Sequence, residues 1–337
     1  MFSKIILAFF LHNLKARPSS LYHLLKGESS IYTKVYGFFY DIRRFIGIFP
    51  KLSKETYEKT IADLVKKNYL EEFENEVRIT TKGLEYLDDF SLENFARIDN
   101  VKYGRMDQAF YRYLLFAIQV VSYASYHEKE YIPLENSPFY KATLKKWFHQ
   151  MKQQNLLLTF VTELTDILSQ LPQETSDYLA RQFSGYQVYG KIYHQLSEND
   201  KYIQFFEQKE ALHTFIATFE KGNYPCLALL LEKLYQKKGN TYQQTWDLFD
   251  EGQSIEEIAR MKQVKAQTIE SHLIHRALID ENFVVKSYPN TLFQSLKGQT
   301  IEEYIHLQFK DFPEFKEDFF SFRMMQLDLI KEIRKNG

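Results

Sequence analysis

A stretch near the C-terminus, "KAQTIESHLIHR", carries polar and basic side chains at helical spacing. A glutamine amide can pair with the edge of an adenine, and serine or threonine hydroxyls can donate to phosphate oxygens. Basic residues at the ends of such a helix can offset phosphate charge. The residue types and their spacing therefore predict a DNA-binding face. Its members are Lys265, Gln267, Thr268, Ser271, His275 and Arg276.

Two further helices are predicted just before this face. Residues 241–249 have a broad apolar side, and Gly252 suits the position after a helix end. Ser254 can cap a second helix while Glu257, three residues later, reaches back to the cap, which is the pattern of a capping box. Three short helices with two tight breaks are typical of a helix-turn-helix.

The third helix would present the polar face. We expect it to begin near Lys265, after a short turn in which Val264 points into the core. The small side chain of Ala259 would allow the second and third helices to cross closely, and Ile269 and Leu273 would hold the third helix down. This third helix corresponds to the recognition helix of a helix-turn-helix, which enters the major groove of DNA with its N-terminal residues toward the bases.

The charge balance argues against a strongly electrostatic DNA contact. The chain has a formal net charge of −1, with acidic and basic residues interspersed. A helix-turn-helix that docks a protein, or three helices that only build the core, therefore remain as alternatives. The acidic residues close to the predicted face are Asp247, Asp250, Glu251, Glu256, Glu257 and Glu270.

The N-terminal segment, residues 1–90, predicts a winged-helix-like domain. In "KLSKETYEKTIADLVKKNYL" the apolar residues from Tyr57 to Val65 fall on one helical stripe, and Ser53 suits the N-cap. The alternating pattern of "YLEEFENEVRITTKG", with a turn at Glu74, predicts a β-hairpin. Lys54 and Lys59 would be exposed on the long helix and are further possible DNA-binding residues.

The middle segment, residues 91–235, predicts an all-helical domain. Apolar residues recur at three- and four-residue spacing, with breaks near Pro133, Pro138 and Pro172, at 197–200 and at 222–225. The polar stretch "QKKGNT", Gln236 to Thr241, predicts the next boundary. Residues 236–337 would form the helix-turn-helix domain with two more C-terminal helices. The fold class predicted is therefore mainly α.

The lack of catalytic sequence motifs favours a non-catalytic protein. The chain lacks a Walker-type phosphate loop, an HExxH sequence and a nucleophile-elbow serine. One cysteine, Cys226, allows neither a disulfide nor a Cys/His zinc spacing. The apolar start "MFSKIILAFFLHNLKARP" is followed by no cleavage site and favours a buried first helix. We therefore expect a cytoplasmic protein without a cofactor, metal or membrane contact.

Two parts of the sequence resemble known proteins. The stretch from Thr241 to Ile274 resembles the helicase-associated helix-turn-helix domain at the C-terminus of some RecQ-type helicases. "RPSSLYHLLKGESS" resembles the YpbB family of low-GC Gram-positive bacteria. Lys265 departs from the domain pattern, because a serine or threonine cap is expected there. The matching positions are Thr241, Thr245, Leu248, Gly252, Ser254, Glu257, Ile258, Ala259, Val264, Thr268, Ile269, His272 and Leu273.

The resemblance implies a cytoplasmic, non-catalytic protein that is encoded beside a RecQ-type helicase and acts with it. No helicase motif is present, so helicase activity does not carry over. The function predicted is a DNA-binding or helicase-partnering accessory protein in DNA metabolism, including DNA repair. One alternative is an adaptor that contacts only proteins. The other is a helix-turn-helix transcription regulator that binds a ligand in its helical middle.

Overall fold

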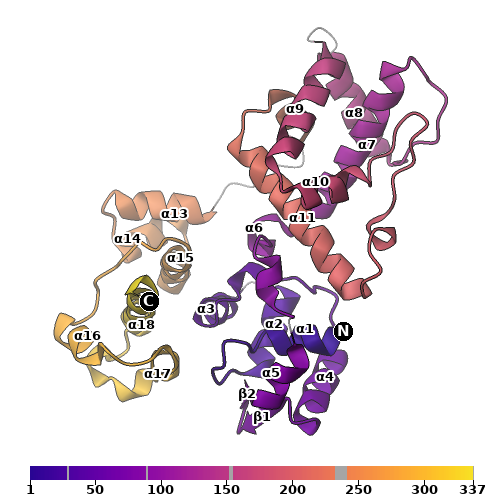
Figure 1. Cartoon of the computed structure of the whole chain (residues 1–337). Coiled ribbons are helices and arrows are strands. Elements are labelled where there is room, and N and C mark those ends of the chain that lie inside the picture. Colours follow the sequence, from indigo (N-terminus) through magenta and orange to yellow (C-terminus); the bar gives the residue numbers. More distant parts are fainter. Residues whose placement is uncertain (29, 89, 152–154, 232–240, 337) are drawn as a thin grey trace. The chain divides into compact units, whose positions relative to one another are not determined.

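The computed structural model describes residues 1–28, 30–88, 90–151, 155–231 and 241–336. These residues form two compact units (Figure 1). Unit 1 combines Met1–Ala8 with Tyr86–Gln236, and unit 2 combines Phe9–Glu85 with Lys237–Gly337. The described residues are mainly helical and contain one two-stranded sheet, as the sequence predicted.

The division into units differs from the three consecutive domains expected from the sequence. The first and third predicted domains pack together in unit 2, where side chains of residues 9–85 contact side chains of residues 241–336. Residues 1–8, predicted as part of the first domain, instead belong to unit 1 with the helical middle segment. The predicted boundary "QKKGNT" lies outside the described residues except for Thr241.

Unit 2 has two lobes, an N-lobe of residues 9–85 and a C-lobe of residues 241–336. The elements of the N-lobe are α2 (Pro18–Lys26), α3 (Ile31–Phe39), the 3₁₀ helix η1 (Arg43–Phe45), α4 (Lys54–Lys66), β1 (Leu70–Phe73), β2 (Glu76–Ile79) and the start of α5 (Thr81–Leu87). The elements of the C-lobe are α13 (Thr241–Asp250), α14 (Ile255–Lys262), α15 (Ala266–Ile279), α16 (Asn290–Leu296), α17 (Ile301–His306), η5 (Phe309–Asp311), η6 (Pro313–Phe315) and α18 (Phe319–Asn336).

The N-lobe has the predicted winged-helix-like order. Ser53 caps α4 by accepting the backbone N–H of Thr56, and Tyr57 is among the side chains that α4 buries. The antiparallel β1–β2 hairpin follows α4 at the predicted position. Ala16 pairs with Val77 and so adds a third strand position to the sheet. In the chain, α3 and η1 stand between α2 and α4, and most residues of α3 are buried.

The C-lobe begins with the predicted helix-turn-helix. Ser254 and Glu257 form the capping box of α14, and Lys265 is the N-cap residue of α15. One expectation was wrong, because Val264 is 39% exposed rather than in the core. The reason is a left-handed Gln263, which ends α14 in a Schellman-type turn and leaves Val264 outside the helix packing.

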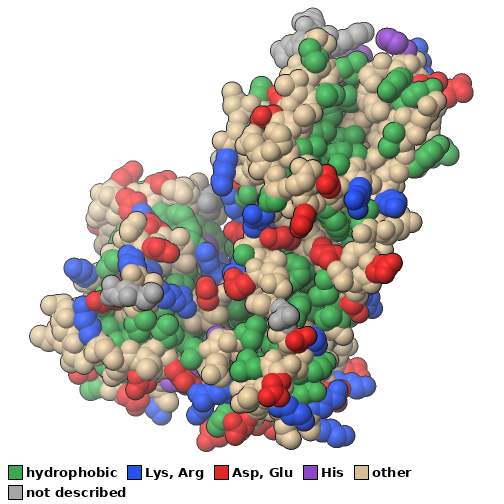
Figure 2. Space-filling model, in the orientation of Figure 1, with side chains coloured by type: hydrophobic (Ala, Val, Ile, Leu, Met, Phe, Trp, Pro, Cys, Tyr) green, Lys and Arg blue, Asp and Glu red, His purple; other side chains and the backbone are tan. Residues whose placement is uncertain are grey.

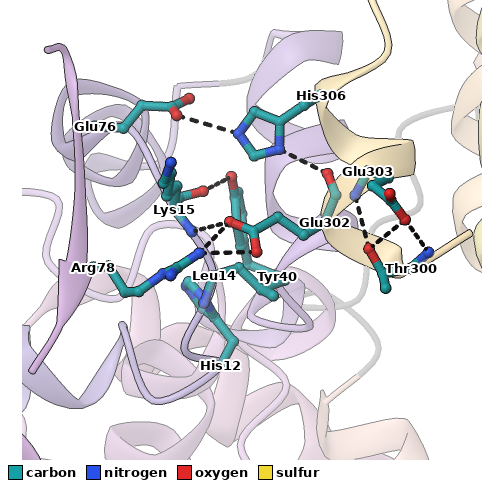
Figure 3. A network of polar contacts seen from close by, with 10 residues as sticks. All are labelled: His12, Leu14, Lys15, Tyr40, Glu76, Arg78, Thr300, Glu302, Glu303 and His306. Atoms are coloured by element: carbon teal, nitrogen blue, oxygen red, sulfur yellow. Dashed lines mark hydrogen bonds and ion pairs between the residues drawn. The ribbon is translucent and has the colours of Figure 1, made fainter. Parts of the chain in front are cut away.

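The two lobes of unit 2 are joined by a network of charged side chains (Figure 3). The terminal nitrogen of Arg78 on β2 contacts both carboxylate oxygens of Glu302 on α17. Glu302 also accepts the backbone N–H of Lys15, and His306 contacts Glu76 at 3.2 Å. Burial opposes ionisation of Glu302, but the Lys15 N–H and the Arg78 guanidinium outweigh it and lower its pKa. These contacts attach the C-lobe to the edge of the N-lobe hairpin.

Unit 1 is all helical in its described part. The helices break near Pro133 and Pro138, at Pro172, at 197–200 and at 222–225, as predicted, but the non-helical segment 181–192 was not predicted. Trp147 of α8 donates to the carbonyl of Cys226 within the core. Its elements are α1 (Phe2–Ala8), η2 (Leu92–Phe95), α6 (Asn100–Tyr103), α7 (Asp107–Ser125), α8 (Pro138–Met151), α9 (Leu156–Gln170), α10 (Gln173–Ala180), η4 (Tyr193–Gln195), α11 (Lys201–Lys221) and α12 (Pro225–Leu231).

A buried charge cluster fixes α7 against α11 in unit 1. The carboxylate of Asp107 lies 2.5 Å from the Lys209 ammonium and 3.0 Å from the His213 ring. Lys209 also donates to Asn100, and His213 accepts the backbone N–H of Asp99. Burial would raise the pKa of Asp107, but His213 and Lys209 lower it. All three side chains are almost fully buried, so the cluster is a structural element rather than an open site.

Candidate nucleic-acid interface

Helix α15 presents the predicted polar residues because its apolar side is fixed in the C-lobe core. Ile269 and Leu273 are fully buried and pack α15 against the rest of the lobe. Lys265, as N-cap, provides no side-chain hydrogen bond to the helix, so its ammonium group is left to project outward. The residues at the start of α15 therefore lie at the surface.

Four of the predicted residues line one open pocket of about 360 Å³. We call this pocket the α3–α15 groove, because α3 of the N-lobe forms its opposite wall. Helix α3 packs directly against α15 within unit 2 (Figure 1). The lining consists of Lys265, Gln267, Thr268, Ser271 and His272 from α15, with Ile31 and Lys34 from α3 and Tyr242 from α13.

Lys34 brings a cation from the N-lobe to this groove. Its ammonium donates to the Tyr242 hydroxyl at 3.0 Å and lies 4.7 Å from the centre of the Tyr242 ring. The pKa of His272 is lowered, first by burial and then by the positive charges of Lys262 and Lys34. These neighbours give the groove a positive field, which suits an anionic ligand.

The hydroxyl and amide groups of the groove differ in the hydrogen bonds that they can form with a ligand. Ser271 donates its hydroxyl to the carbonyl of Gln267 at 2.7 Å, so its oxygen is left mainly as an acceptor. The Gln267 side chain is exposed and offers both an amide donor and a carbonyl acceptor. Gln267 is therefore the residue of the groove best placed to read the edge of a base.

His275 does not reach the groove. Its ring packs against Tyr242 with 4.6 Å between centroids, and its Nδ1 atom is buried without a partner among the described residues. Burial, followed by the charges of Lys34 and Arg43, lowers the pKa of His275 to about 3. The side chain is thus neutral at physiological pH and packs against Tyr242 and Trp246 of α13.

Arg276 also lies outside the groove and forms its contacts with α13 and Phe283. Its guanidinium lies 2.7 Å from a carboxylate oxygen of Asp250 and 4.3 Å from the centre of the Phe283 ring. The side chain is 18% exposed and closes the packing of α13 against α15. The structure thus brings together four of the six residues predicted on this helix and separates His275 and Arg276 from them.

The acidic residue within the predicted face lies on another side of α15. The pKa of Glu270 is raised, mainly by burial and further by the negative charges of Asp318 and Glu256. Glu270 does not line the α3–α15 groove. It therefore detracts less from the positive field of the groove than its sequence position suggests.

The two lysines predicted on the N-lobe lie apart from this groove. Lys54 and Lys59 are exposed on α4, as expected. Lys54 pairs with Glu58 at 3.6 Å, so part of its charge is already offset.

The described part of the chain contains no group of three or more His, Cys, Asp or Glu side chains that could hold a metal ion. None of its helices combines the length and the apolar character needed to cross a membrane.

The comparison with protein families concerns the lobe that carries the groove. Residues 241–329 match the family model of a helix-turn-helix domain. This match covers α13 to α15 and most of the C-terminal helices, so the helix-turn-helix domain spans nearly the whole C-lobe. Helix-turn-helix domains commonly read DNA with the helix that corresponds to α15.

The chain is also similar to Protein YpbB of Bacillus subtilis (strain 168). The two are 20% identical over 330 residues, which cover 94% of this chain and 93% of that protein. The similarity thus includes the N-lobe and the helical unit as well as the helix-turn-helix domain. No solved structure matches the chain.

Sequence reasoning missed the residues that the N-lobe contributes. Lys34 and Tyr242 are 208 positions apart, and no local pattern links them. "IYTKVYGFF" is an apolar helix with one lysine, which the sequence analysis did not single out. The strong apolar character of this segment was the available signal, because a helix with so few polar residues needs neighbouring elements to cover it.

Proposed function

We propose that this protein binds single-stranded DNA in the α3–α15 groove and acts as an accessory factor of a RecQ-type helicase. One observation carries the DNA part of the proposal. Lys34 and Lys265, from two segments far apart in the sequence, meet Gln267, Thr268 and Ser271 in one groove of a helix-turn-helix domain. The set combines two cations with neutral hydrogen-bonding groups, and Tyr242 adds an aromatic ring.

The walls of the groove favour a single strand over a duplex. A reading helix must enter the major groove of B-DNA, which is about 12 Å wide. Helix α3 packs along the polar side of α15 and would occupy that space. A single strand needs only a positive groove and a ring on which a base can stack. Binding without sequence preference is therefore expected.

The helicase part of the proposal rests on resemblance. The sequence of the helix-turn-helix is similar to a domain found in RecQ-type helicases, and a helicase generates the single strands that such a groove could hold. The proposal assigns no catalytic step to this chain. Its role would be to hold the displaced strand or to place the helicase on it, in the cytoplasm.

The DNA part is tested by fluorescence anisotropy with a labelled thymidine oligonucleotide and its duplex form. We expect tighter binding of the single strand. Lys34→Ala and Lys265→Ala should each weaken binding and lower the slope of log affinity against log salt by about 0.7. Lys59→Ala, a lysine exposed on α4, is the matched control and should leave the slope unchanged. Preference for one duplex sequence would favour the transcription regulator instead.

The helicase part is tested separately by pull-down of the purified RecQ-type helicase, with and without nuclease. Retention after nuclease treatment supports direct contact. If Gln267→Ala combined with Ser271→Ala abolishes helicase binding and leaves DNA binding intact, the helix-turn-helix is a docking module and the adaptor reading is correct. Binding of neither ligand by the parent protein would refute both parts.

A further inference from the structure

A second groove lies in unit 1 and has no part in the proposed DNA site. It has a volume of about 600 Å³ and runs along α7, beside Tyr140 of α8 and the segment 182–194. We call it the α7 groove. Apolar and aromatic side chains make up much of its lining, namely Tyr111, Leu115, Leu134, Tyr140, Ile192 and Tyr193.

The rim of the α7 groove exposes apolar side chains to solvent. Leu134 is 50% exposed and Ile192 is 62% exposed. Val188 and Tyr189, which belong to the segment 182–194 but do not line the groove, are also exposed. Figure 2 shows that hydrophobic side chains are open to solvent on the part of the surface formed by unit 1. Single exposed apolar residues are ordinary, but apolar residues on both sides of a groove indicate a surface that another molecule covers.

The charged residues that line this groove are all basic. Arg112 and Lys191 line it, and none of its lining residues is acidic. Arg112 is paired with the buried Glu135, whereas Lys191 forms no ion pair with any described residue. The floor is neutral, because buried Gln182 and Gln208 satisfy each other at 3.0 Å. A ligand with apolar side chains and flanking negative charge would complement this pattern.

The secondary structure of unit 1 limits how a peptide could bind. Its described residues form no β-strand, so no sheet edge is available to pair with an extended peptide. A groove between helices instead accepts the apolar face of an amphipathic helix, whose anchors recur at three- and four-residue spacing. The lining is too apolar for a nucleic-acid track, and one of its two cations, Arg112, is already paired with Glu135.

We propose that the α7 groove binds an acidic amphipathic helix of a partner protein. Leucine- or phenylalanine-like anchors of that helix would lie against Leu115, Leu134 and Ile192. Glutamate or aspartate beside the anchors would pair with Lys191 and compete with Glu135 for Arg112. This inference goes beyond the proposed function, since it requires neither DNA binding nor a helicase as the source of the helix.

The test uses the full-length protein and a random-peptide phage library. Peptides are selected on the parent protein and then measured by fluorescence anisotropy against variants. We expect selected peptides with helical periodicity and net negative charge. Ile192→Asp and Lys191→Glu should each weaken their binding by at least about tenfold. Val161→Asp is the matched control, because Val161 is 51% exposed in the same unit and does not line the groove.

A charge exchange makes the test sharper. A peptide in which lysine replaces its acidic residues should bind the Lys191→Glu variant better than it binds the parent. Circular dichroism should show that all three variants keep the parent fold, since each changed side chain is exposed. Selection of no peptide, of peptides without acidic bias, or of peptides that Val161→Asp weakens equally would overturn the proposal. So would a self-association of the protein that Ile192→Asp abolishes, because a second copy would then be the occupant.

Discussion

The Nη2 atom of Arg78 lies 2.6 and 2.9 Å from the two carboxylate oxygens of Glu302. The two residues are 224 positions apart, yet they lie in the same compact unit. Each side chain is about two-thirds buried. This pair attaches the helix-turn-helix domain to the winged-helix-like lobe, and with it the wall that α3 contributes to the proposed DNA groove.

Glu302→Gln should destabilise unit 2, because the amide cannot replace the charge that faces Arg78 and the Lys15 N–H. The expected loss in the free energy of unfolding is about 1–3 kcal/mol. Urea unfolding measures it. Glu58→Gln is the control, since it removes an exposed pair with Lys54 and should cost less than about 0.5 kcal/mol. Equal effects of the two substitutions would mean that the lobes are not held by this contact.

Two buried histidines predict how the stability of unit 2 depends on pH. Burial lowers the pKa of His12 to about 4, although Glu302 acts in the opposite direction, and the pKa of His275 is about 3. Below the ordinary histidine pKa the unfolded chain binds protons that the folded unit does not. Stability should therefore be complete above pH 6.5 and fall as the pH is lowered toward 4, by at most about 1.4 kcal/mol per pH unit for each histidine.

Hydrogen exchange followed by mass spectrometry can measure this for unit 2 peptides alone. His275→Leu should flatten part of the pH dependence while keeping the packing against Tyr242. An unfolding free energy that stays constant between pH 6.5 and 5 would contradict the burial of these two rings.

Lys209→Met should strongly destabilise unit 1. The substitution leaves the carboxylate of Asp107 buried beside His213, whose pKa is lowered mainly by burial, and without its cationic partner; breaking such a cluster costs about 3–5 kcal/mol. The control is Lys102→Met, whose ammonium is more than half exposed in its pair with Glu220. Thermal unfolding should show a large shift for the first variant and a small one for the second. Tolerance of Lys209→Met would mean that Asp107 is protonated in the folded protein.

The purified protein should hydrolyse no nucleotide, with or without DNA. The motivation is the lack of a phosphate-binding loop in the sequence. A coupled ATPase assay checks this, with the RecQ-type helicase as the positive control. Turnover that follows the protein through a second purification and survives removal of contaminants would refute the non-catalytic proposal.

Local features of this chain were predictable from the sequence because their causes lie within a few residues. The capping box of Ser254 and Glu257, the Ser53 cap and the β1–β2 hairpin all occur where their patterns indicate. The burial of Ile269 and Leu273 followed from helical spacing in the same way.

The surroundings of the candidate site were not predictable, because they depend on distant segments. The wheel of α15 correctly separated its core side from its polar side. It could not show that α3 forms the other wall or that Lys34 adds a cation. The contacts responsible join residues more than 200 positions apart.

The C-lobe packs against the N-lobe but is synthesised after most of unit 1, and this affects the order in which the protein can fold during synthesis. The N-lobe ends at residue 85, and the described part of its partner lobe begins at residue 241. A ribosome adding roughly 5–20 residues per second needs about 8–30 s to make the intervening segment. Throughout that interval α15 does not yet exist, and the side of α3 that α15 covers in the folded protein stays open. A nascent-chain chaperone that holds apolar helices would therefore act on the first lobe, while unit 1 completes itself first.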